Sequence, residues 1–281
     1  MQHAGCQIIA FVGVSGGLGL STLASLLAWT FVRRRLRCTI VDTDITGGGL
    51  DVLLGIEAES GMRFGDISAP LGQLDGTALY HELPSWERIG VLSVNPWNAA
   101  CPDWWEQQAA ITALQEVNDV LVIDAGLGVH LGELALPPTV QTVLLTELSV
   151  LGLARTKALL KSDNSRDNSV QPLLVGIHPR SMPRQMTPLS LDEAQDYLGV
   201  ELIGVMSWCK RLSDSMLSGF GIPRIPKQYL PLLDVLADAV LNHQGENSLH
   251  VIEQSRSEGA LAKDGRKQSS SLDVERARNE E

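Results

Sequence analysis

The chain has few cationic and aromatic residues and no long apolar run. It carries 22 lysines and arginines against 33 acidic residues, and its formal net charge is −11. This balance disfavours nonspecific nucleic-acid binding and electrostatic docking on anionic membranes, because both depend on Lys and Arg neutralising phosphates. No run of about 20 apolar residues is present, so we expect no transmembrane helix. We therefore expect no nucleic-acid partner and at most an indirect contact with a membrane.

Cysteine is also scarce. The four cysteines, Cys6, Cys38, Cys101 and Cys209, lie far apart and form no C-x-x-C motif. Isolated cysteines in largely apolar settings indicate reduced thiols, and neither a disulfide framework nor a zinc site. No signal peptide is visible at the N-terminus, because a basic first region is missing. We therefore expect a cytoplasmic location.

Short apolar runs alternate along the chain with longer amphipathic segments. The predicted strands are rich in Val, Ile and Leu without polar alternation, which is typical of strands buried on both faces. These strands are Gln7–Val12, Cys38–Asp42, Ile89–Val94, Val120–Asp124, Thr142–Thr146, Pro172–Ile177 and Leu202–Met206. The predicted helices are Ser21–Arg35, Asp103–Glu116, Val150–Lys161, Leu191–Leu198, Ser213–Ser218 and Leu230–Asn242. This order predicts an α/β fold, with a mostly parallel sheet covered by helices on both faces.

The domain organisation follows from a change in composition near the C-terminus. We expect one folded domain over residues 1–243. Residues 244–281 mix Ser, Glu, Arg, Lys and Gln with few large apolar side chains. Such a segment cannot bury enough apolar surface to offset its conformational entropy, so we expect a disordered polar tail. The tail is either an inert solvated segment or one that folds on contact with a partner.

A glycine-rich loop between the first predicted strand and the first predicted helix is the most informative segment. Residues 11–23 read Phe-Val-Gly-Val-Ser-Gly-Gly-Leu-Gly-Leu-Ser-Thr-Leu. A strand, a glycine turn and a helix start place backbone N–H groups and the positive end of a helix dipole around a phosphate. The first hydroxyl of such a loop meets Mg²⁺ and the second a phosphate oxygen, and both can cap the helix. The predicted nucleotide-binding residues are Gly16, Gly17, Leu18, Gly19, Leu20, Ser21 and Thr22.

The loop lacks the lysine of the G-x-x-x-x-G-K-[ST] phosphate-binding pattern, because Leu20 stands at that position. A lysine there places positive charge beside the terminal phosphates. Its loss should cost about 3 kcal/mol or more, or roughly a hundredfold in rate. Binding can survive through backbone amides, the two hydroxyls and Mg²⁺. The alternative is a tight strand-to-helix turn with no ligand.

Acidic residues follow two of the predicted strands. Asp42 and Asp44 stand two residues apart at the end of the second strand, and Asp124 ends the run Val120–Asp124. Carboxylates beside a phosphate loop can hold Mg²⁺, directly or through water, or orient an attacking water. We predict Asp44 as the catalytic candidate and Ser21, Asp42, Asp44 and Asp124 as the Mg²⁺ set. The alternative is an Asp-rich turn and an ordinary strand-ending Asp.

These motifs carry a resemblance to a known family. Residues 42–57 fit the spacing D-x-D-I-x-G-x-x-L-D-x-x-x-G-x-E, and residues 15–22 fit a deviant loop, K-G-G-x-G-K-[ST]-[ST], with Ser15 and Leu20 at the lysine positions. The chain resembles the MinD/ParA family of P-loop ATPases. Within it, the chain is similar to the actinobacterial CpaE/TadZ-like, septum-site-determining-like group. That group has a G-x-R-[WF] segment, which Gly61-Met-Arg-Phe64 matches.

The resemblance implies a P-loop NTPase architecture, with ATP and Mg²⁺ as ligands. It implies a role in placing a pilus-assembly or secretion machine, or a septum, through protein partners that recruit the chain to a pole, a septum or the inner face of the membrane. Because both lysines are replaced, the chain would be a regulatory or localisation factor and at most a weak ATPase. In this family the lysine that Ser15 replaces crosses a dimer interface to the partner's nucleotide, so its absence argues against a nucleotide-switched dimer of the usual kind. A homodimer of another kind stays an open alternative. The family's base-reading Asn corresponds in position to His178.

Two other functions stay open. One is a genuine slow ATPase in which a cation from a partner, or Arg180, substitutes for the lysine. The other is a short-chain-dehydrogenase-like NAD(P) binder, in which Asp42 would hold a ribose hydroxyl. That chemistry needs a Tyr followed by Lys four residues later, and none of the three tyrosines has it.

A basic run at the end of the first predicted helix contains Arg33, Arg34, Arg35 and Arg37. Cations are favoured at a helix C-terminus by the helix dipole. We interpret this run as a solvated helix end in preference to a polynucleotide-binding patch.

Overall fold

The computed structural model describes residues 5–45, 49–70, 72–95, 97, 102–163, 170–180 and 188–242. The chain divides into two units, residues 1–240 and 241–281. The first unit contains the sheet and both candidate ligand sites. The predicted tail, residues 244–281, lies outside the described residues, so the predicted domain boundary stays a prediction.

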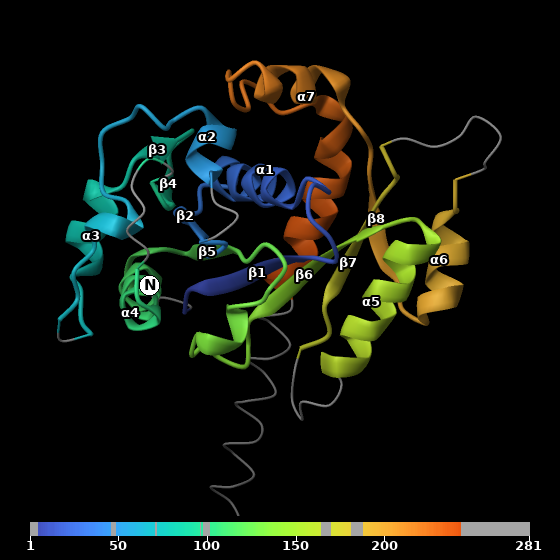
Figure 1. The fold of residues 1–281 in the computed structure, drawn as a ribbon, viewed down its shortest axis with the longest axis horizontal. Helices are drawn as coiled ribbons and strands as arrows, with labels where there is room; N and C mark the ends of the chain where they lie inside the picture. Colours follow the sequence, from blue (N-terminus) through green and yellow to red (C-terminus); the bar gives the residue numbers. More distant parts are fainter. Residues whose placement is uncertain are drawn as a thin grey trace, which may run out of the picture. The chain divides into compact units, whose positions relative to one another are not determined.

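An eight-stranded sheet forms the centre of the first unit (Figure 1). Its order is β3-β4-β2-β5-β1-β6-β7-β8. All neighbouring strands run parallel except β3 and β4. The strands are β1 Gln7–Gly13, β2 Cys38–Asp42, β3 Ser85–Trp86, β4 Ile89–Leu92, β5 Val120–Asp124, β6 Gln141–Glu147, β7 Leu173–Ile177 and β8 Leu202–Met206.

Helices cover both faces of this sheet, with α1 on one side and α4 and α5 on the other in Figure 1. The α-helices are α1 Leu20–Arg33, α2 Leu50–Leu54, α3 Gly76–Glu82, α4 Trp104–Val117, α5 Val150–Asp163, α6 Leu191–Leu198, α7 Lys210–Leu217 and a last helix over residues 230–242. Short 3₁₀ helices occupy Phe64–Asp66, Leu131–Glu133 and Lys227–Tyr229. The predicted α/β class is confirmed. None of the helices in the described part of the chain is both long enough and apolar enough to span a bilayer.

The strand order contradicts the dehydrogenase alternative. A dinucleotide-binding sheet places its second strand directly beside the first, so that an acidic residue ending the second strand reaches the ribose. Here β5 lies between β2 and β1. The NAD(P) interpretation is therefore wrong, because a whole strand separates Asp42 from the strand that leads into the glycine loop.

The same order brings the predicted acidic residues to one edge of the sheet. Phe11 on β1 is paired in register with Asp124 on β5, and Asp124 is paired with Asp42 on β2. Every residue of these three strands is buried, so the strands show no alternation of buried and exposed side chains. Parallel strands bind ligands beyond their carboxyl ends, which is where the glycine loop also lies.

Candidate functional site

The glycine loop ends in a helix start that differs from the predicted one. The α1 helix begins at Leu20, and its N-cap is Gly19 in the left-handed conformation, with φ of 91°. A residue with a Cβ is disfavoured there, which accounts for the glycine. The prediction that Ser21 and Thr22 cap the helix is wrong, because no side chain caps it. The first-turn N–H groups of α1 are left for a ligand, and the helix dipole favours an anion there.

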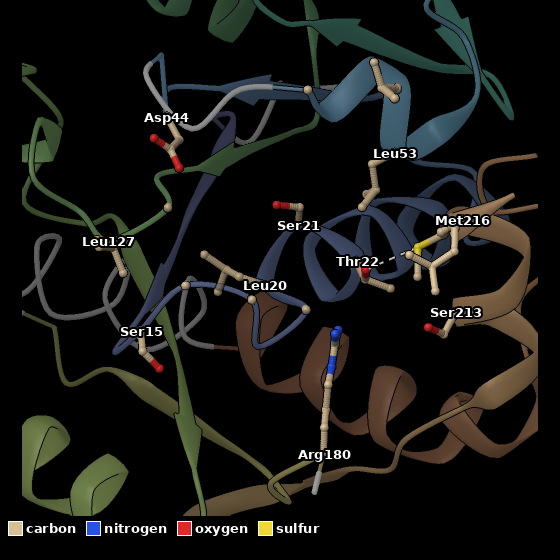
Figure 2. Close-up of a pocket in the computed structure, with 17 residues that line it drawn as sticks. Ser15, Leu20, Ser21, Thr22, Asp44, Leu53, Leu127, Arg180, Ser213 and Met216 are labelled. Carbon is tan, nitrogen blue, oxygen red and sulfur yellow. Dashed lines mark hydrogen bonds between the residues drawn. The ribbon is translucent and has the colours of Figure 1, made fainter. Parts of the chain in front are cut away.

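A cavity of about 450 Å³ opens in front of this loop (Figure 2). Its size falls in the range of small-molecule sites, about 300–1,000 Å³. Most of the predicted nucleotide-binding residues line it, and α2, the loop after β5, and α7 close it. The lining residues are Ser15, Gly16, Gly17, Gly19, Leu20, Ser21, Thr22, Asp44, Gly49, Val52, Leu53, Gly126, Leu127, Arg180, Ser213, Met216 and Leu217.

The side chains of three of the predicted ligand residues are largely occupied by contacts within the protein. Leu20 is 8% exposed, and its Cδ2 lies 3.7 Å from the place a Cβ on Gly13 would take, so it packs into the loop. The Thr22 hydroxyl donates to the sulfur of Met216 on α7 at 3.8 Å, drawn as the dashed line in Figure 2. Leu18 is buried and lines a small neighbouring hollow of about 30 Å³. Any contact of Leu18 with a ligand in the main cavity would have to come from its backbone.

Asp42 and Asp124 form a buried carboxyl pair behind the cavity. Their side chains are almost completely removed from solvent. Burial, and then repulsion from Asp124, raise the pKa of Asp42 well above its ordinary value, against hydrogen bonds donated by the N–H groups of Asp44 and Leu50. Burial likewise raises the pKa of Asp124, although the Ser21 hydroxyl and the Gly126 N–H donate to its carboxylate. The pair therefore resists carrying two negative charges unless a cation is close.

Asp44 is the carboxylate that reaches the cavity wall. It is half-buried and packs against Gly126, whose φ of 54° is left-handed. A Cβ on Gly126 would collide with the Asp44 carboxylate. Glycine is therefore required at this position, because the loop after β5 passes close to the Asp44 side chain. Asp44 and Ser21 thus face the cavity, whereas Asp42 and Asp124 lie one layer behind.

The oxygen atoms that face the cavity suit Mg²⁺, which needs few protein ligands, better than a metal ion that is coordinated by protein side chains alone. Within the described ranges, no group of three or more His, Cys, Asp and Glu side chains is arranged to hold a metal ion. The cavity instead offers a hydroxyl hydrogen-bonded to a carboxylate, Ser21 with Asp124, and the carboxylate of Asp44. Mg²⁺ commonly keeps several waters and takes only one or two protein oxygens beside substrate phosphates.

One basic side chain, Arg180, is found among the described residues that line the cavity. It follows β7, and Figure 2 shows its guanidinium group pointing into the cavity toward the loop. The guanidinium carbon lies 4.4 Å from the centre of the Trp208 ring, a cation–π stack that holds it in place. His178, in the position expected to read a base, lines neither of the two hollows. Its ring nitrogen Nδ1 is buried and without a hydrogen-bond partner among the described residues.

A buried ion pair supports the α2 wall of the cavity and gives the G-x-R-[WF] segment a structural role. The Arg63 Nε lies 3.3 Å from Asp51 Oδ2, and both side chains are buried. The same guanidinium donates to the carbonyl oxygens of Gly61, Ile56 and Glu59. Asp51 is in the first turn of α2, whose residues Val52 and Leu53 face the cavity.

The residues from α2 and α7 that line the cavity were not predicted as site residues. Met216 and Leu217 follow the loop by almost 200 residues in sequence and have no ligand-binding signature of their own. No local pattern could have found them, because only the packing of α7 against α1 brings them to the loop.

Comparisons with known proteins agree with the fold. No protein-family model matches the chain. An uncharacterized protein of Mycobacterium tuberculosis is 35% identical over 86 residues, which is 31% of this chain and 23% of that protein. A putative septum site-determining protein MinD of Oltmannsiellopsis viridis is 25% identical over 209 residues, 71% of this chain and 64% of that protein. The chain therefore spans about a quarter and just under two thirds of these relatives.

Solved structures show the fold directly. A ParA family ATPase from Chlorobium tepidum matches with a TM-score of 0.61 and 20% identity over 84% of this chain and 98% of that one. MinD from Aquifex aeolicus, in its complex with MinC, matches with a TM-score of 0.63 and 17% identity over 85% and 96%. MinD from Pyrococcus horikoshii, complexed with Mg-ADP, matches with 0.57 and 17% over 84% and 96%. The chain has the fold of the MinD/ParA P-loop ATPases.

Proposed function

We propose that the cavity binds ATP with Mg²⁺, and that the chain is a CpaE/TadZ-like regulatory or localisation factor with weak or no ATP hydrolysis. One observation carries this proposal. An open glycine loop and a bare helix N-terminus face a cavity of about 450 Å³, while the side chain at the lysine position, Leu20, is buried and uncharged. The Mg-ADP complex of the similarly folded Pyrococcus MinD supports the choice of ligand.

The backbone and the side chains of the site have distinct roles in this proposal. The N–H groups of the loop glycines and of the first turn of α1 would bind phosphate oxygens. Ser21, Asp44 and, through its hydrogen bond to Ser21, Asp124 would hold Mg²⁺, which supplies positive charge at the phosphates. Asp42 would position the turn by accepting the N–H groups of Asp44 and Leu50.

Hydrolysis should be weak because the wall of the cavity has little positive charge. Leu20 gives dispersion contacts but cannot stabilise charge that develops on a transferring phosphoryl group. Ser15 lines the cavity in place of the second lysine and is equally neutral. Backbone N–H groups can thus bind the phosphates, but the positive side chains that would lower the barrier to phosphoryl transfer are missing at these two positions.

A second candidate is a slow ATPase, and Arg180 is the observation that favours it. Its guanidinium group already lines the cavity and can bind phosphate oxygens through two parallel N–H donors. A fixed arginine could then supply part of the transition-state charge that lysine supplies elsewhere.

Isothermal titration calorimetry tests whether the cavity binds nucleotide at all. Mg-ATP and Mg-ADP should each release or absorb measurable heat at up to millimolar ligand, whereas adenosine without phosphates should bind far more weakly. No heat with either nucleotide would sink the nucleotide proposal and leave a nucleotide-free scaffold.

Phosphate release separates the two candidates. Under the leading proposal, the wild type and Asp44→Asn release phosphate at the same background rate. Under the second, the wild type is faster, and both Asp44→Asn and Arg180→Ala fall to background. Arg155→Ala, which removes an exposed arginine from α5, is the matched control and should behave as wild type.

The cellular role is proposed from the resemblance and from the septum site-determining relatives. We propose that protein partners of a pilus, secretion or division machine bind the nucleotide-loaded chain and recruit it from the cytoplasm to a pole, a septum or the inner membrane face. Residues 1–243 would form the binding domain. Immobilised chain should retain such a partner more strongly with Mg-ATP than without nucleotide, and equal retention would count against a nucleotide-dependent role.

A further inference from the structure

A third hollow, of about 510 Å³, lies at the opposite edge of the sheet from the glycine loop. It is surrounded by the end of α1, the starts of β2 and β5, and the turn between β3 and β4. The glycine loop follows the carboxyl end of β1, so the two sites lie at opposite ends of the parallel strands. The residues that line it are Val32, Arg33, Arg35, Leu36, Arg37, Arg88 and Asp119. Four arginines thus face one hollow in a chain whose formal net charge is −11.

Two of these arginines occupy backbone positions that suit glycine or asparagine. Arg35 has φ of 66° at the end of α1, where the Leu36 N–H donates to Phe31 O at 3.1 Å in a helix ending that usually places glycine in the left-handed position. Arg88 has φ of 69° in the two-residue turn between β3 and β4, where Asn-Gly is preferred. Residues with a Cβ are strained in both places, and both hold arginine and face the same hollow.

The charges in the hollow are largely unbalanced. The side chains of Arg35 and Arg88 are exposed and make no hydrogen bond or ion pair with any residue that the structure describes. Arg33 stacks on Trp29, with 4.8 Å between its guanidinium carbon and the ring centre. The acidic lining residue, Asp119, accepts the backbone N–H of Arg37 at 2.7 Å. The Arg37 guanidinium donates to the carbonyl oxygen of Val117 at 2.8 Å and lies 5.7 Å from the centre of the Tyr80 ring. The described lining residues therefore include four arginines and one carboxylate, and Arg35 and Arg88 are the two arginines whose side chains have no partner there.

The neighbouring Arg34 behaves differently and shows what a merely structural arginine does here. Its guanidinium is paired with Asp234 and Asp238 on the last helix and does not line the hollow. Arg33, Arg35 and Arg37 are exposed, as the interpretation of a solvated helix end expects, and they also line one hollow together with Arg88 from a different element.

We propose that this hollow binds a compact anion that carries two or more phosphate charges, either free in solution or as the head group of an anionic lipid. Guanidinium groups match phosphate oxygens through paired N–H donors, and several of them around one concave surface favour a multiply charged ligand. The field of a chain with 11 excess negative charges opposes an extended polyanion, so a ligand that fits inside the hollow is favoured over nucleic acid. This inference does not depend on nucleotide binding at the glycine loop.

The test uses a variant that should fold at least as well as the wild type. Arg35→Gly/Arg88→Gly removes two charges and also relieves two strained backbone positions, so its melting temperature should not fall. The matched control, Arg155→Ala/Arg224→Ala, removes two exposed arginines from elsewhere. Titration with inorganic tripolyphosphate, without Mg²⁺, should show at least tenfold weaker binding in the glycine variant than in the wild type and the control. Mg-ATP affinity should be the same in all three.

A second arm distinguishes the two sources of the anion. Sedimentation with vesicles that contain cardiolipin, whose head group carries two phosphates, against vesicles of phosphatidylcholine alone, should show binding that the glycine variant loses if the ligand is a lipid head group. Loss of tripolyphosphate binding without any vesicle binding supports a free ligand. Equal binding of both probes by the wild type and the glycine variant, no binding of either probe by the wild type, or binding of duplex DNA alone would each overturn the proposal.

Discussion

Leu20 stands at the first position of α1, where a phosphate-binding loop normally extends a lysine toward its ligand, and its buried, uncharged side chain lines the cavity. The cavity in front of it keeps the backbone dipoles and hydroxyls of such a loop. Under the proposed function, the missing charge at this position and at Ser15, and not the shape of the loop, distinguishes ligand binding from efficient catalysis.

Leu20→Lys should therefore strengthen Mg-ATP binding and raise phosphate release by roughly ten- to a hundredfold, because it restores a cation beside the terminal phosphates. The measurements are calorimetry and steady-state phosphate release. Leu20→Met, which keeps the volume and the neutrality, should match the wild type. Equal affinities and rates for the lysine and methionine variants would contradict this account.

The buried pair of Asp42 and Asp124 makes stability depend on pH. Because the pKa of Asp42 is raised above its ordinary value of 3.8, the folded chain binds this proton more tightly than the unfolded chain. The free energy of unfolding should then fall as pH rises from about 4 through the raised pKa. Asp42→Asn cannot ionise, so its melting temperature should exceed that of the wild type by a few degrees at pH 7, and the difference should vanish near pH 4.

Melting curves between pH 4 and 8, without Mg²⁺, check this expectation. Glu116→Gln, at an exposed carboxylate on α4, should leave the pH dependence as it is in the wild type. A constant difference between Asp42→Asn and wild type across this range would show that the pair does not titrate as described.

At the scale of elements, α2 and its supporting loop are the part of the site that depends on a single buried contact. Arg63 joins Asp51 to three backbone carbonyls, so its removal leaves a buried carboxylate and several acceptors unsatisfied. The residues around it were recognised as a motif from the sequence, but the reason for the arginine was visible only once its four acceptors lay together.

Arg63→Ala should lower the free energy of unfolding by about 3–5 kcal/mol, the usual cost of breaking a buried ion pair. Arg63→Lys keeps the charge without the planar fork and should fall between the alanine variant and wild type. Urea unfolding measures both, and Mg-ATP affinity should weaken in parallel because α2 lines the cavity. A loss under about 1 kcal/mol in the alanine variant would show that the pair is not needed to hold α2.

Buried strands were predicted well from their apolar runs, and β2 and β5 match their predicted bounds. The mostly exposed helix α6 also matches its predicted bounds. The two-residue strand β3 and the seven-residue helix α3 were missed, because each is too short to show a period.

For the whole molecule, the excess of acidic residues predicts weak contact with nucleic acid. Nonspecific protein–DNA complexes have Kd values of about 10⁻⁴ to 10⁻⁶ M at physiological salt, and they depend on many Lys and Arg contacts. The wild type should therefore bind duplex DNA more weakly than about 10⁻⁴ M at 150 mM salt. Fluorescence anisotropy measures this, with a known basic DNA-binding protein as the positive control. Micromolar binding that weakens steeply with salt would contradict the expectation.

The sequence alone determined the α/β class, the glycine loop and the missing lysines, because apolar runs, glycines and residue types are local properties of the chain. Only the tertiary structure decided the strand order that rejects a dinucleotide site, the position of Arg180 in the cavity and the convergence of four arginines at the far edge of the sheet. Each of these depends on contacts between segments that are distant in sequence, and packing of the whole sheet and its helices, not any local pattern, brings such segments together.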